Sequence, residues 1–243
     1  MTLTKMIYHI PETTSTNDDL RDAKYREGDI VWADFQTAGR GQRGHKWSSN
    51  VGENLLFSVA LEPSFLPAAE QFLLSETVAL SLVDLFAEYG IAAEIKWTND
   101  IYVGDRKIVG ILIEHIYSGA KLARTIVGIG INVNQREFDP SLPNPTSMSL
   151  QTGGTFDLRT VLERFSEILM RNYESLRSGE KEVVQQRYKS KMYRLDERHT
   201  FASPDGVRFE ATIRGVKPAG ELVVEHSDGE VREYLFKEIE FVL

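Results

Sequence analysis

A nine-residue stretch, "GRGQRGHKW" at positions 39–47, has the composition of a loop that binds an anion. Its three glycines leave the backbone free to adopt positive φ angles and to bring amide groups close to a ligand. Arg40 and Arg43 add planar, permanently charged guanidinium groups. The loop lacks the Gly-Lys-Ser/Thr ending of a nucleotide triphosphatase phosphate loop. A solvated basic turn would have the same composition, because glycine and arginine are ordinary loop residues.

A second stretch, "KWTNDIYVGDRKIVGILIE" at positions 96–114, brings together groups that suit a nucleotide and its metal. Asn99 and Asp100 carry oxygen atoms of the kind that magnesium prefers. Lys96 and Lys107 are point charges that can pair with phosphate. The alternative for Asn99 and Asp100 is a simple turn, since both residue types favour turns.

The strand that follows Lys107 contains a glycine, Gly110, at an interior position. Strict alternation along an extended segment from 107 to 113 places Lys107 and Gly110 on opposite faces. An interior glycine weakens a strand unless another group must approach closely, so it predicts either a close contact or a β-bulge.

A third stretch, "VGIGINVN" at positions 127–134, predicts a strand with one bare face. Gly128 and Gly130 lie on that face, and Asn132 follows on the same side. A flat apolar ligand could lie there, although close packing of two layers explains the glycines equally well. The stretch is not a dinucleotide-binding fingerprint, because no third glycine opens a helix.

Taken together, the three stretches favour a reaction in which a carboxylate attacks a nucleotide phosphate. The protein would provide an apolar floor, a lysine, an Asn-Asp pair and an Arg/Gly loop that can close. Its main tasks would be to position two anions and to stabilise charge at phosphorus. No protein nucleophile is needed for this chemistry.

The elements around these stretches indicate an α+β fold with a mixed sheet. We expect a short helix over 15–28 and strands over 29–36 and 53–61, which the basic loop connects. A longer helix is expected over 67–90, with its apolar stripe at Phe72, Ala79, Leu82, Val83 and Phe86. Four further strands are predicted over 93–97, 100–103, 107–117 and 123–133, with hairpin turns at 104–106 and 118–119.

The remainder of the chain predicts a change of architecture near residue 190. Three of the eight prolines fall in the irregular segment 137–150, and a helical stripe occupies 157–179. Turn-forming residues then divide the C-terminal segment into short strands, which is typical of a small β-barrel. We therefore expect two domains, at 1–190 and 191–243.

Composition limits the classes of protein to which the chain can belong. The 243 residues carry a net charge of −8, so no general positive field is available to bind nucleic acid. The absence of cysteine rules out disulfides, thiolate zinc ligands and cysteine nucleophiles. No apolar run reaches the length of a membrane helix and no signal peptide is recognisable, so we expect a soluble cytoplasmic protein that binds no membrane.

In the three stretches described above, and in the segment 13–20, the sequence resembles the biotin protein ligases. The matching pieces are "TTSTNDDL" (13–20), "DFQTAGRGQRGHKWSS" (34–49), "KWTNDIYVGDRKIVGILIE" (96–114) and "VGIGINVN" (127–134), in the order found in that family. The resemblance implies a mixed-sheet catalytic domain followed by an SH3-like β-barrel. It also implies an enzyme that converts biotin and Mg-ATP into biotinyl-5′-AMP. The biotinyl group then passes to a lysine of a biotin carboxyl carrier domain of the acetyl-CoA carboxylase type.

The resemblance also implies roles for individual residues. Arg40 and Lys107 would be catalytic, stabilising charge on the activated carboxylate and phosphate. The residues implied to bind biotin are Ser15, Thr16, Asn17, Gln36, Gly39, Arg40, Gly41, Gln42, Trp47, Lys107, Gly110, Leu112, Gly128 and Gly130. Those implied at ATP are Arg43, Lys96, Asn99, Asp100 and Asn132, with Asn99 and Asp100 also near magnesium.

The sequence departs from the family pattern in ways that bear on function. Gln42 stands where many members have arginine, which removes one cationic contact to phosphate. The chain starts just before "STN", whereas members that also act as repressors carry an N-terminal DNA-binding domain, so we expect a ligase of the short form without repressor function. The alternatives are a lipoate ligase-like acyl-adenylate transferase and a non-catalytic biotin-binding module. A homodimer is compatible with the sequence.

Overall fold

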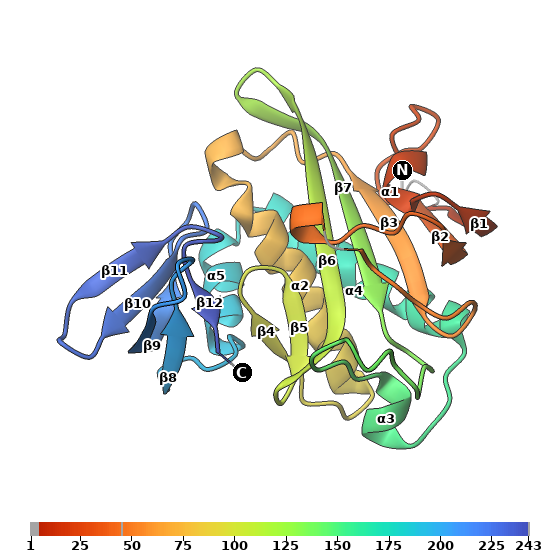
Figure 1. Cartoon of the computed structure of the whole chain (residues 1–243). Helices are drawn as coiled ribbons and strands as arrows, with labels where there is room; N and C mark the ends of the chain where they lie inside the picture. The colour runs from red at the N-terminus through yellow and green to blue at the C-terminus, as the bar shows by residue number, and fades with distance from the viewer. Residues whose placement is uncertain (1–4, 45, 243) are drawn as a thin grey trace.

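The computed structural model describes residues 5–44 and 46–242, apart from the side chain of Arg43. Its larger part is a seven-stranded sheet with the strand order β1-β2-β3-β7-β6-β5-β4 (Figure 1). Only β1 and β2 run parallel, and the other neighbours pair antiparallel, so the sheet is mixed as expected. The strands are β1 (Ile7–Thr13), β2 (Ile30–Gln36), β3 (Leu55–Leu61), β4 (Glu94–Lys96), β5 (Asp100–Val103), β6 (Arg106–Ser118) and β7 (Lys121–Ile131).

Three helices pack against the sheet and bury its apolar residues in one large core. These are α2 (Phe72–Glu88), α4 (Leu158–Arg177) and α5 (Lys181–Ser190), and Figure 1 shows α2 and α4 crossing behind the strands. Alternate strand residues such as Val127, Ile129 and Ile131 join this core, as does Phe165 of α4. The opposite sheet face is therefore the one left to carry a site.

Two glycine-bearing strands pair directly at that second face. Gly110 of β6 lies opposite Gly130 of β7, and Leu112 lies opposite Gly128. Because residues two apart along a strand share a face, these four positions form one continuous patch in which only Leu112 carries a side chain. The glycines that the sequence places on one strand face are therefore neighbours in the sheet, and their role as the floor of a ligand site stays a prediction.

A β-bulge moves Lys107 to the face opposite the one that alternation predicts. Tyr102 pairs with Lys107 while Ile101 pairs with Val109, so Ile108 is an extra residue in β6. An extra residue shifts the alternation by one position, which places Lys107 on the same face as Gly110. The expectation that these two residues lie on opposite faces was wrong, because the bulge cannot be read from strand periodicity.

The C-terminal part forms a separate antiparallel sheet of five strands in the order β11-β10-β9-β8-β12. Trp97 donates a hydrogen bond from Nε1 to the carbonyl of Gly220 at 2.9 Å, joining the two sheets. The domain boundary at 190/191 and the SH3-like barrel stay predictions. The strands are β8 (Arg198–Ala202), β9 (Arg208–Val216), β10 (Leu222–His226), β11 (Val231–Tyr234) and β12 (Glu240–Phe241).

Most predicted elements are confirmed, and the differences occur where periodicity is weak. The helix expected over 15–28 is one short turn, α1 (Thr16–Asp19), followed by turns up to Gly28. The edge strand β1 and helix α5 have no counterpart in the prediction. A short helix, α3 (Met148–Thr152), begins inside the irregular segment 137–150 and ends two residues beyond it. Helix α4 begins as expected, with Asp157 Oδ1 accepting a hydrogen bond from the amide of Thr160 at 2.7 Å.

Candidate active site

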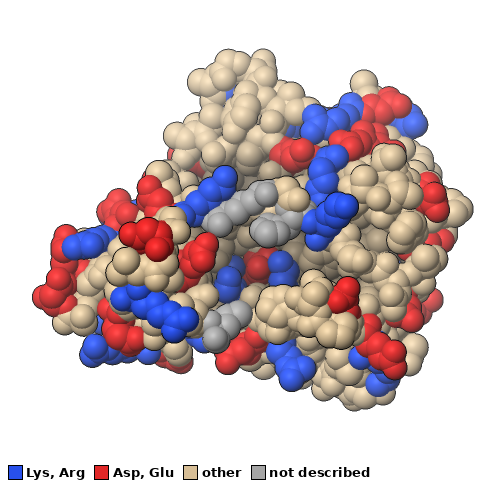
Figure 2. All heavy atoms as spheres, viewed as in Figure 1, with Lys and Arg blue, Asp and Glu red and all other residues tan. Residues whose placement is uncertain are grey.

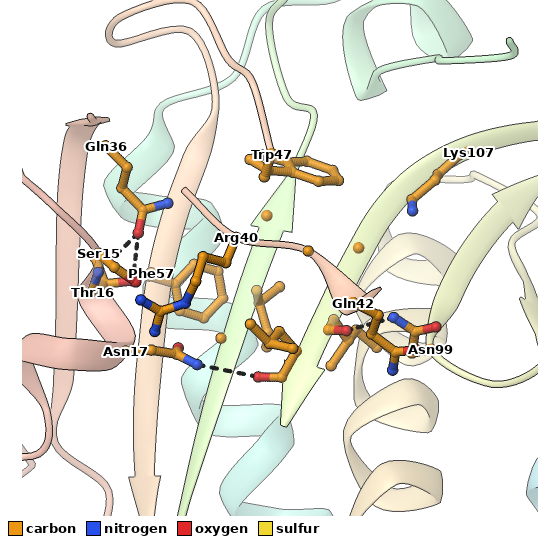
Figure 3. Close-up of a pocket in the computed structure, with 17 residues that line it drawn as sticks. Ser15, Thr16, Asn17, Gln36, Arg40, Gln42, Trp47, Phe57, Asn99 and Lys107 are labelled. Carbon is orange, nitrogen blue, oxygen red and sulfur yellow. Dashed lines mark hydrogen bonds between the residues drawn. The ribbon is translucent and has the colours of Figure 1, made fainter. Parts of the chain in front are cut away.

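A pocket on the open sheet face collects residues from α1, the 37–54 loop and strands β2, β3, β6 and β7 (Figure 3). Ser15, Thr16 and Gln36 lie on one side of this space, and Lys107 and Asn99 lie on the other. The cavity holds about 50 Å³. Its lining consists of Ser15, Thr16, Asn17, Gln36, Arg40, Gly41, Gln42, Trp47, Phe57, Asn99, Lys107, Gly110, Ile111, Leu112, Gly128, Ile129 and Gly130.

One end of the pocket is formed by the uncharged side chains of Ser15, Thr16 and Gln36, and we call it the neutral end. Hydrogen bonds from Thr16 hold Gln36 in place there. Its Oε1 accepts from the amide of Thr16 at 2.8 Å and from Thr16 Oγ1 at 3.2 Å. This fixes the side-chain amide, and its Nε2 points toward the pocket (Figure 3). Within the described part of the chain, Gln36 Nε2 and the hydroxyl of Ser15 have no hydrogen-bond partner. These two groups are therefore available to a ligand.

Unlike Gln36, Asn17 has hydrogen-bond partners at both polar atoms of its side-chain amide. Its Oδ1 accepts a hydrogen bond from Ser58 Oγ at 2.5 Å, and its Nδ2 donates to Glu114 Oε2 at 2.8 Å. Gly128 makes this position possible, since a Cβ there would come within 2.3 Å of Asn17 Oδ1. Asn17 thus shapes the pocket and orients its neighbours.

The indole of Trp47 covers the other two floor glycines. A Cβ on Gly110 would lie 2.6 Å from the Trp47 ring, and a Cβ on Gly130 would lie 2.3 Å from it. The amide of Trp47 donates to the carbonyl of Gly39 at 3.0 Å, which closes the basic loop on itself. The three glycines therefore make room for the side chains of Asn17 and Trp47.

Arg40 reaches from the loop to the pocket rim and makes a bidentate ion pair with Asp18 of α1. The two N···O distances are 2.7 and 2.8 Å. Hydrogen bonding to the guanidinium lowers the pKa of Asp18, and the same bonds raise the pKa of Arg40. Glu114 lies 3.8 Å from Arg40 Nη2 and adds a second carboxylate to this rim.

Lys107 supplies the second cation of the pocket. Its Nζ lies 2.7 Å from Asp100 Oδ1 and 5.7 Å from the centre of the Trp47 ring. Asn99 also lines the pocket, and its Nδ2 donates a hydrogen bond to the carbonyl of Ile111 at 2.6 Å. Arg40 and Lys107 thus line one cavity, and each is paired with its own carboxylate.

Several predicted residues lie around the pocket rather than in it. Lys96 and Asp100 line an adjoining cavity that reaches the C-terminal sheet, and Asn132 lines another beside the 138–145 segment. Both adjoining cavities share Trp47 and Lys107 with the main pocket. Gly39 accepts a hydrogen bond from the amide of Trp47, and a Cβ at Gly39 would meet Gln36. The side chain of Arg43 lies outside the described part.

The sequence did not point to several residues that build the site. Phe57, Ile111 and Ile129 complete the pocket lining, and Asp18, Ser58 and Glu114 bind its polar side chains. Asp18 lies within the motif "TTSTNDDL", but its partner Arg40 is 22 positions away. No sequence spacing signals that pairing.

Comparison with known proteins places this pocket in a recognised family. The model for the biotin/lipoate A/B protein ligase family matches residues 6–132, which is more than half of the chain and includes every residue that lines the pocket. The chain belongs to this family. The match begins just before β1 and ends just after β7, so it covers the strands and loops that position the site.

Individual members of the family match the chain over different lengths. A bifunctional ligase/repressor BirA of Salmonella typhimurium is 30% identical over 95% of this chain and 72% of its own length. A biotin–[acetyl-CoA-carboxylase] ligase of Paracoccus denitrificans is 35% identical over 63% of this chain and 67% of its own length. The chain spans only 46–50% of the length of three other curated relatives.

A solved family structure resembles this ligase-family chain throughout both sheets. The biotin protein ligase from Aquifex aeolicus, in complex with biotin and ATP, superposes with a TM-score of 0.83 at 29% identity. The match covers 98% of this chain and 99% of that one. The expected α+β fold, with a mixed sheet packed with helices and a smaller antiparallel sheet, is thereby confirmed.

Charged side chains of both signs lie on the surface of this family member. Figure 2 shows acidic and basic side chains intermixed over the visible face. Across residues 5–44 and 46–242, no three His, Cys, Asp or Glu side chains gather as metal ligands. None of the described helices is both long and apolar enough to cross a membrane.

Proposed function

We propose that this chain is a biotin protein ligase that works through biotinyl-5′-AMP. In the first step a carboxylate oxygen of biotin attacks the α-phosphorus of ATP, and pyrophosphate leaves. In the second step the amine of a carrier lysine attacks the acyl carbon, the C–O bond to phosphate breaks and AMP leaves. The lysine of a biotin carboxyl carrier domain would be the acceptor, and the amine loses one proton.

The observation that carries this proposal is a single pocket with a neutral end and a cationic end. Ser15 and Gln36 offer an uncharged hydroxyl and amide, which suit the ureido group of biotin. Arg40 and Lys107 line the same cavity and suit the carboxylate and the phosphate. A purely apolar acyl chain would leave Gln36 Nε2 without a partner, so biotin fits this end better than lipoate or octanoate.

The cations act mainly by stabilising charge that develops during adenylation. As the new P–O bond forms, negative charge grows on the phosphate oxygens beside Lys107 and Arg40. Both must exchange their present carboxylate partners for the ligand, because Lys107 is bonded to Asp100 and Arg40 to Asp18. Closure of the 37–54 loop would then exclude water from the reactive anhydride.

Magnesium is expected to arrive with ATP rather than to reside in the protein. It usually binds through one or two carboxylates together with substrate phosphates. Asp100 offers one carboxylate beside Lys107, and Asn99 Oδ1 adds an amide oxygen that already accepts from Thr98. We assign Asn99, Asp100, Lys96, Asn132 and Arg43 to the nucleotide and its metal.

The remaining functional expectations are part of the same proposal. We propose no DNA-binding role, since the net charge of −8 gives no general attraction to phosphate. The two-domain division, the cytoplasmic location and a homodimer are likewise proposed.

Two half-reactions test the proposal directly. Exchange of labelled pyrophosphate into ATP should require biotin and should not be supported by lipoate or octanoate. Addition of a carrier domain should then place one biotinyl group on one lysine, as read by mass spectrometry of the digested carrier. Exchange that is independent of biotin, or faster with lipoate, would show that the assignment is wrong.

A further inference from the structure

A carboxylate that does not line the pocket bonds to a side chain that does. Glu114 of β6 lies outside the lining, and its Oε2 accepts a hydrogen bond at 2.8 Å from Nδ2 of the pocket residue Asn17. We propose that Glu114 is a positioning residue that holds the Asn17 amide in one orientation and so presents its oxygen, Oδ1, to a ligand N–H group. This inference rests on the proposed function, because the ureido group of biotin supplies the N–H.

The charge of Glu114 decides which end of the Asn17 amide faces it. An ionised carboxylate accepts hydrogen bonds but cannot donate them, so a reversed amide would bring two acceptor oxygens together. The carbonyl of Leu112, 3.5 Å from Nδ2, adds a second acceptor on the same side (Figure 3). A Cβ on Gly128 would come within 2.3 Å of Oδ1 and 3.1 Å of Nδ2, so both atoms lie close over this glycine. Amide nitrogen and oxygen are nearly equal in size, and hydrogen bonding rather than packing therefore selects the orientation.

The oxygen of the amide is directed to the neutral end of the pocket. Oδ1 of Asn17 accepts from Ser58 Oγ at 2.5 Å, and Ser58 Oγ lies 2.7 Å from Thr16 Oγ1. All three residues are buried. An amide oxygen has two lone pairs. Ser58 occupies one of them, so the second can accept a hydrogen bond from a ligand.

This orientation of Asn17 complements a cyclic urea. A ureido ring has one carbonyl acceptor and two N–H donors. Gln36 Nε2 provides a donor and Asn17 Oδ1 an acceptor, and both residues lie on the same side of one cavity (Figure 3). With the amide reversed, an N–H of Asn17 would face an N–H of the ligand, and two donors cannot bond to each other. Glu114 therefore favours a ligand with an N–H group at this end.

Arg21 makes the arrangement sensitive to the charge of Glu114. Arg21 Nη2 donates to Glu114 Oε1 at 2.9 Å, while Arg40 Nη2 lies 3.8 Å from Oε2, beyond hydrogen-bond distance. A carboxylate has one acceptor oxygen for Arg21 and another for Asn17. A glutamine at this position has a single oxygen, and the charge-assisted bond from Arg21 is the stronger competitor for it. The amide nitrogen of that glutamine would then face Asn17 and reverse it.

The experiment measures biotin binding by calorimetry in full-length Glu114→Gln, Arg21→Ala and the double variant. Glu114→Gln should weaken binding about three- to ten-fold, which is the contribution of one hydrogen bond. Adding Arg21→Ala should restore binding to within about two-fold of Arg21→Ala alone, because the introduced amide can then turn its oxygen to Asn17. Glu88→Gln is the matched control and should bind as the wild type does, since Glu88 bonds to Arg164 and does not line the pocket.

A second ligand separates loss of the acceptor from general loosening of the pocket. The probe is the cyclic carbonate analogue of biotin, in which oxygen replaces both N–H groups and the carbonyl remains. The wild type should prefer biotin to this analogue. The preference should fall about three- to ten-fold in Glu114→Gln, because only biotin offers an N–H to Asn17. A loosened pocket would bind both ligands more weakly to the same extent.

The side-chain amide of Asn17 reports its own orientation in the absence of ligand. Its nitrogen and proton NMR signals, in protein labelled at asparagine, are assigned from their absence in Asn17→Ser. They should shift in Glu114→Gln and return toward the wild-type positions when Arg21→Ala is added. In Glu88→Gln they should stay in place.

The outcomes separate this inference from the proposed function. Unchanged Asn17 signals in Glu114→Gln, an unchanged preference for biotin, or a double variant that binds as weakly as Glu114→Gln overturns the role of Glu114. Failure of the wild type to bind biotin overturns the proposed function and the ligand contact with it. The Asn17 signals then still show whether Glu114 sets the orientation of the amide.

Discussion

The indole of Trp47 lies so close to Gly130 that a methyl group there would come within 2.3 Å of Trp47 Cε2. The two residues are 83 positions apart in sequence, on the basic loop and on β7. Since that distance is shorter than any real Cβ contact, the closed position of the loop depends on the missing side chain. Gly110 on the neighbouring strand β6 likewise leaves room for the Trp47 ring, which a Cβ there would approach to 2.6 Å.

Gly130→Ala should therefore prevent Trp47 from lying on the sheet and leave the loop open. We expect biotin-dependent pyrophosphate exchange to fall at least about ten-fold, because a misplaced loop loses positioning of the reacting groups. Gly154→Ala is the matched control, since its Cβ would meet only ordinary contacts of 3.4 Å or more. Adding Trp47→Ala to Gly130→Ala should cause little further loss. Full additive losses in the double variant would show that the two positions act independently.

Lys107→Met should abolish adenylation and leave the protein folded. The variant keeps the apolar stem and removes the charge next to the phosphate, so exchange should drop about a hundred-fold or more. Lys217→Met is a suitable control because Lys217 pairs with Glu233 in the C-terminal sheet. Melting temperature measured by circular dichroism should remain near that of the wild type. Exchange at wild-type rates in Lys107→Met would exclude this lysine from the reaction.

Ser58→Ala should weaken both stability and biotin binding. Ser58 is fully buried and links Thr16 to Asn17, with Oγ···Oγ1 2.7 Å and Oγ···Oδ1 2.5 Å. Removing the hydroxyl leaves the buried Asn17 Oδ1 without its donor, at a cost of about 1–3 kcal/mol in the free energy of unfolding. Urea denaturation and biotin titration measure the two effects, with Ser178→Ala on an exposed helix end as control. Unchanged affinity would mean that this chain of hydrogen bonds does not orient the ligand groups.

Glu76 should make the protein less stable as pH rises. Burial in α2 raises the pKa of Glu76 to about 8 from an ordinary value of 4.5. Between these values the folded state keeps a proton that the unfolded state has lost. The free energy of unfolding therefore falls as pH rises from about 4.5 to 8 and then levels off.

Glu76→Gln tests this directly by removing the titration. The variant should match the wild type near pH 5 and exceed its free energy of unfolding at pH 8 by up to about 4 kcal/mol. Glu163→Gln, on an exposed position of α4, should keep the wild-type slope. Parallel pH profiles for Glu76→Gln and wild type would contradict the assignment.

The sequence predicts those parts of the site whose residues lie close together in the chain. It does not predict contacts between residues that are far apart in the chain. The resemblance to the biotin protein ligases, carried by the basic loop and the glycines of β6 and β7, implied that Gly110, Gly128 and Gly130 lie in one site with Trp47, and all four line the same pocket. The face of Lys107 was predicted wrongly, because a single-residue bulge reverses strand alternation.

Hydrogen bonds between residues that are far apart in the chain could not be predicted from the sequence. Asn17 bonds to Ser58 and Glu114, which are 41 and 97 positions away, and only the sheet order brings them together. Strand β1 escaped prediction because it is an edge strand with a weak burial pattern. Helix α5 has only two fully buried residues, Val184 and Tyr188, so its apolar periodicity is weak.

A crystal structure with a non-hydrolysable analogue of biotinyl-5′-AMP would test the central claim most directly. We predict one ligand across the pocket, with its ureido group at Gln36 Nε2 and its phosphate between Arg40 and Lys107. Both cations should have left Asp18 and Asp100 for the ligand. An analogue bound elsewhere, or bound with either cation still paired to its present carboxylate, would contradict this account.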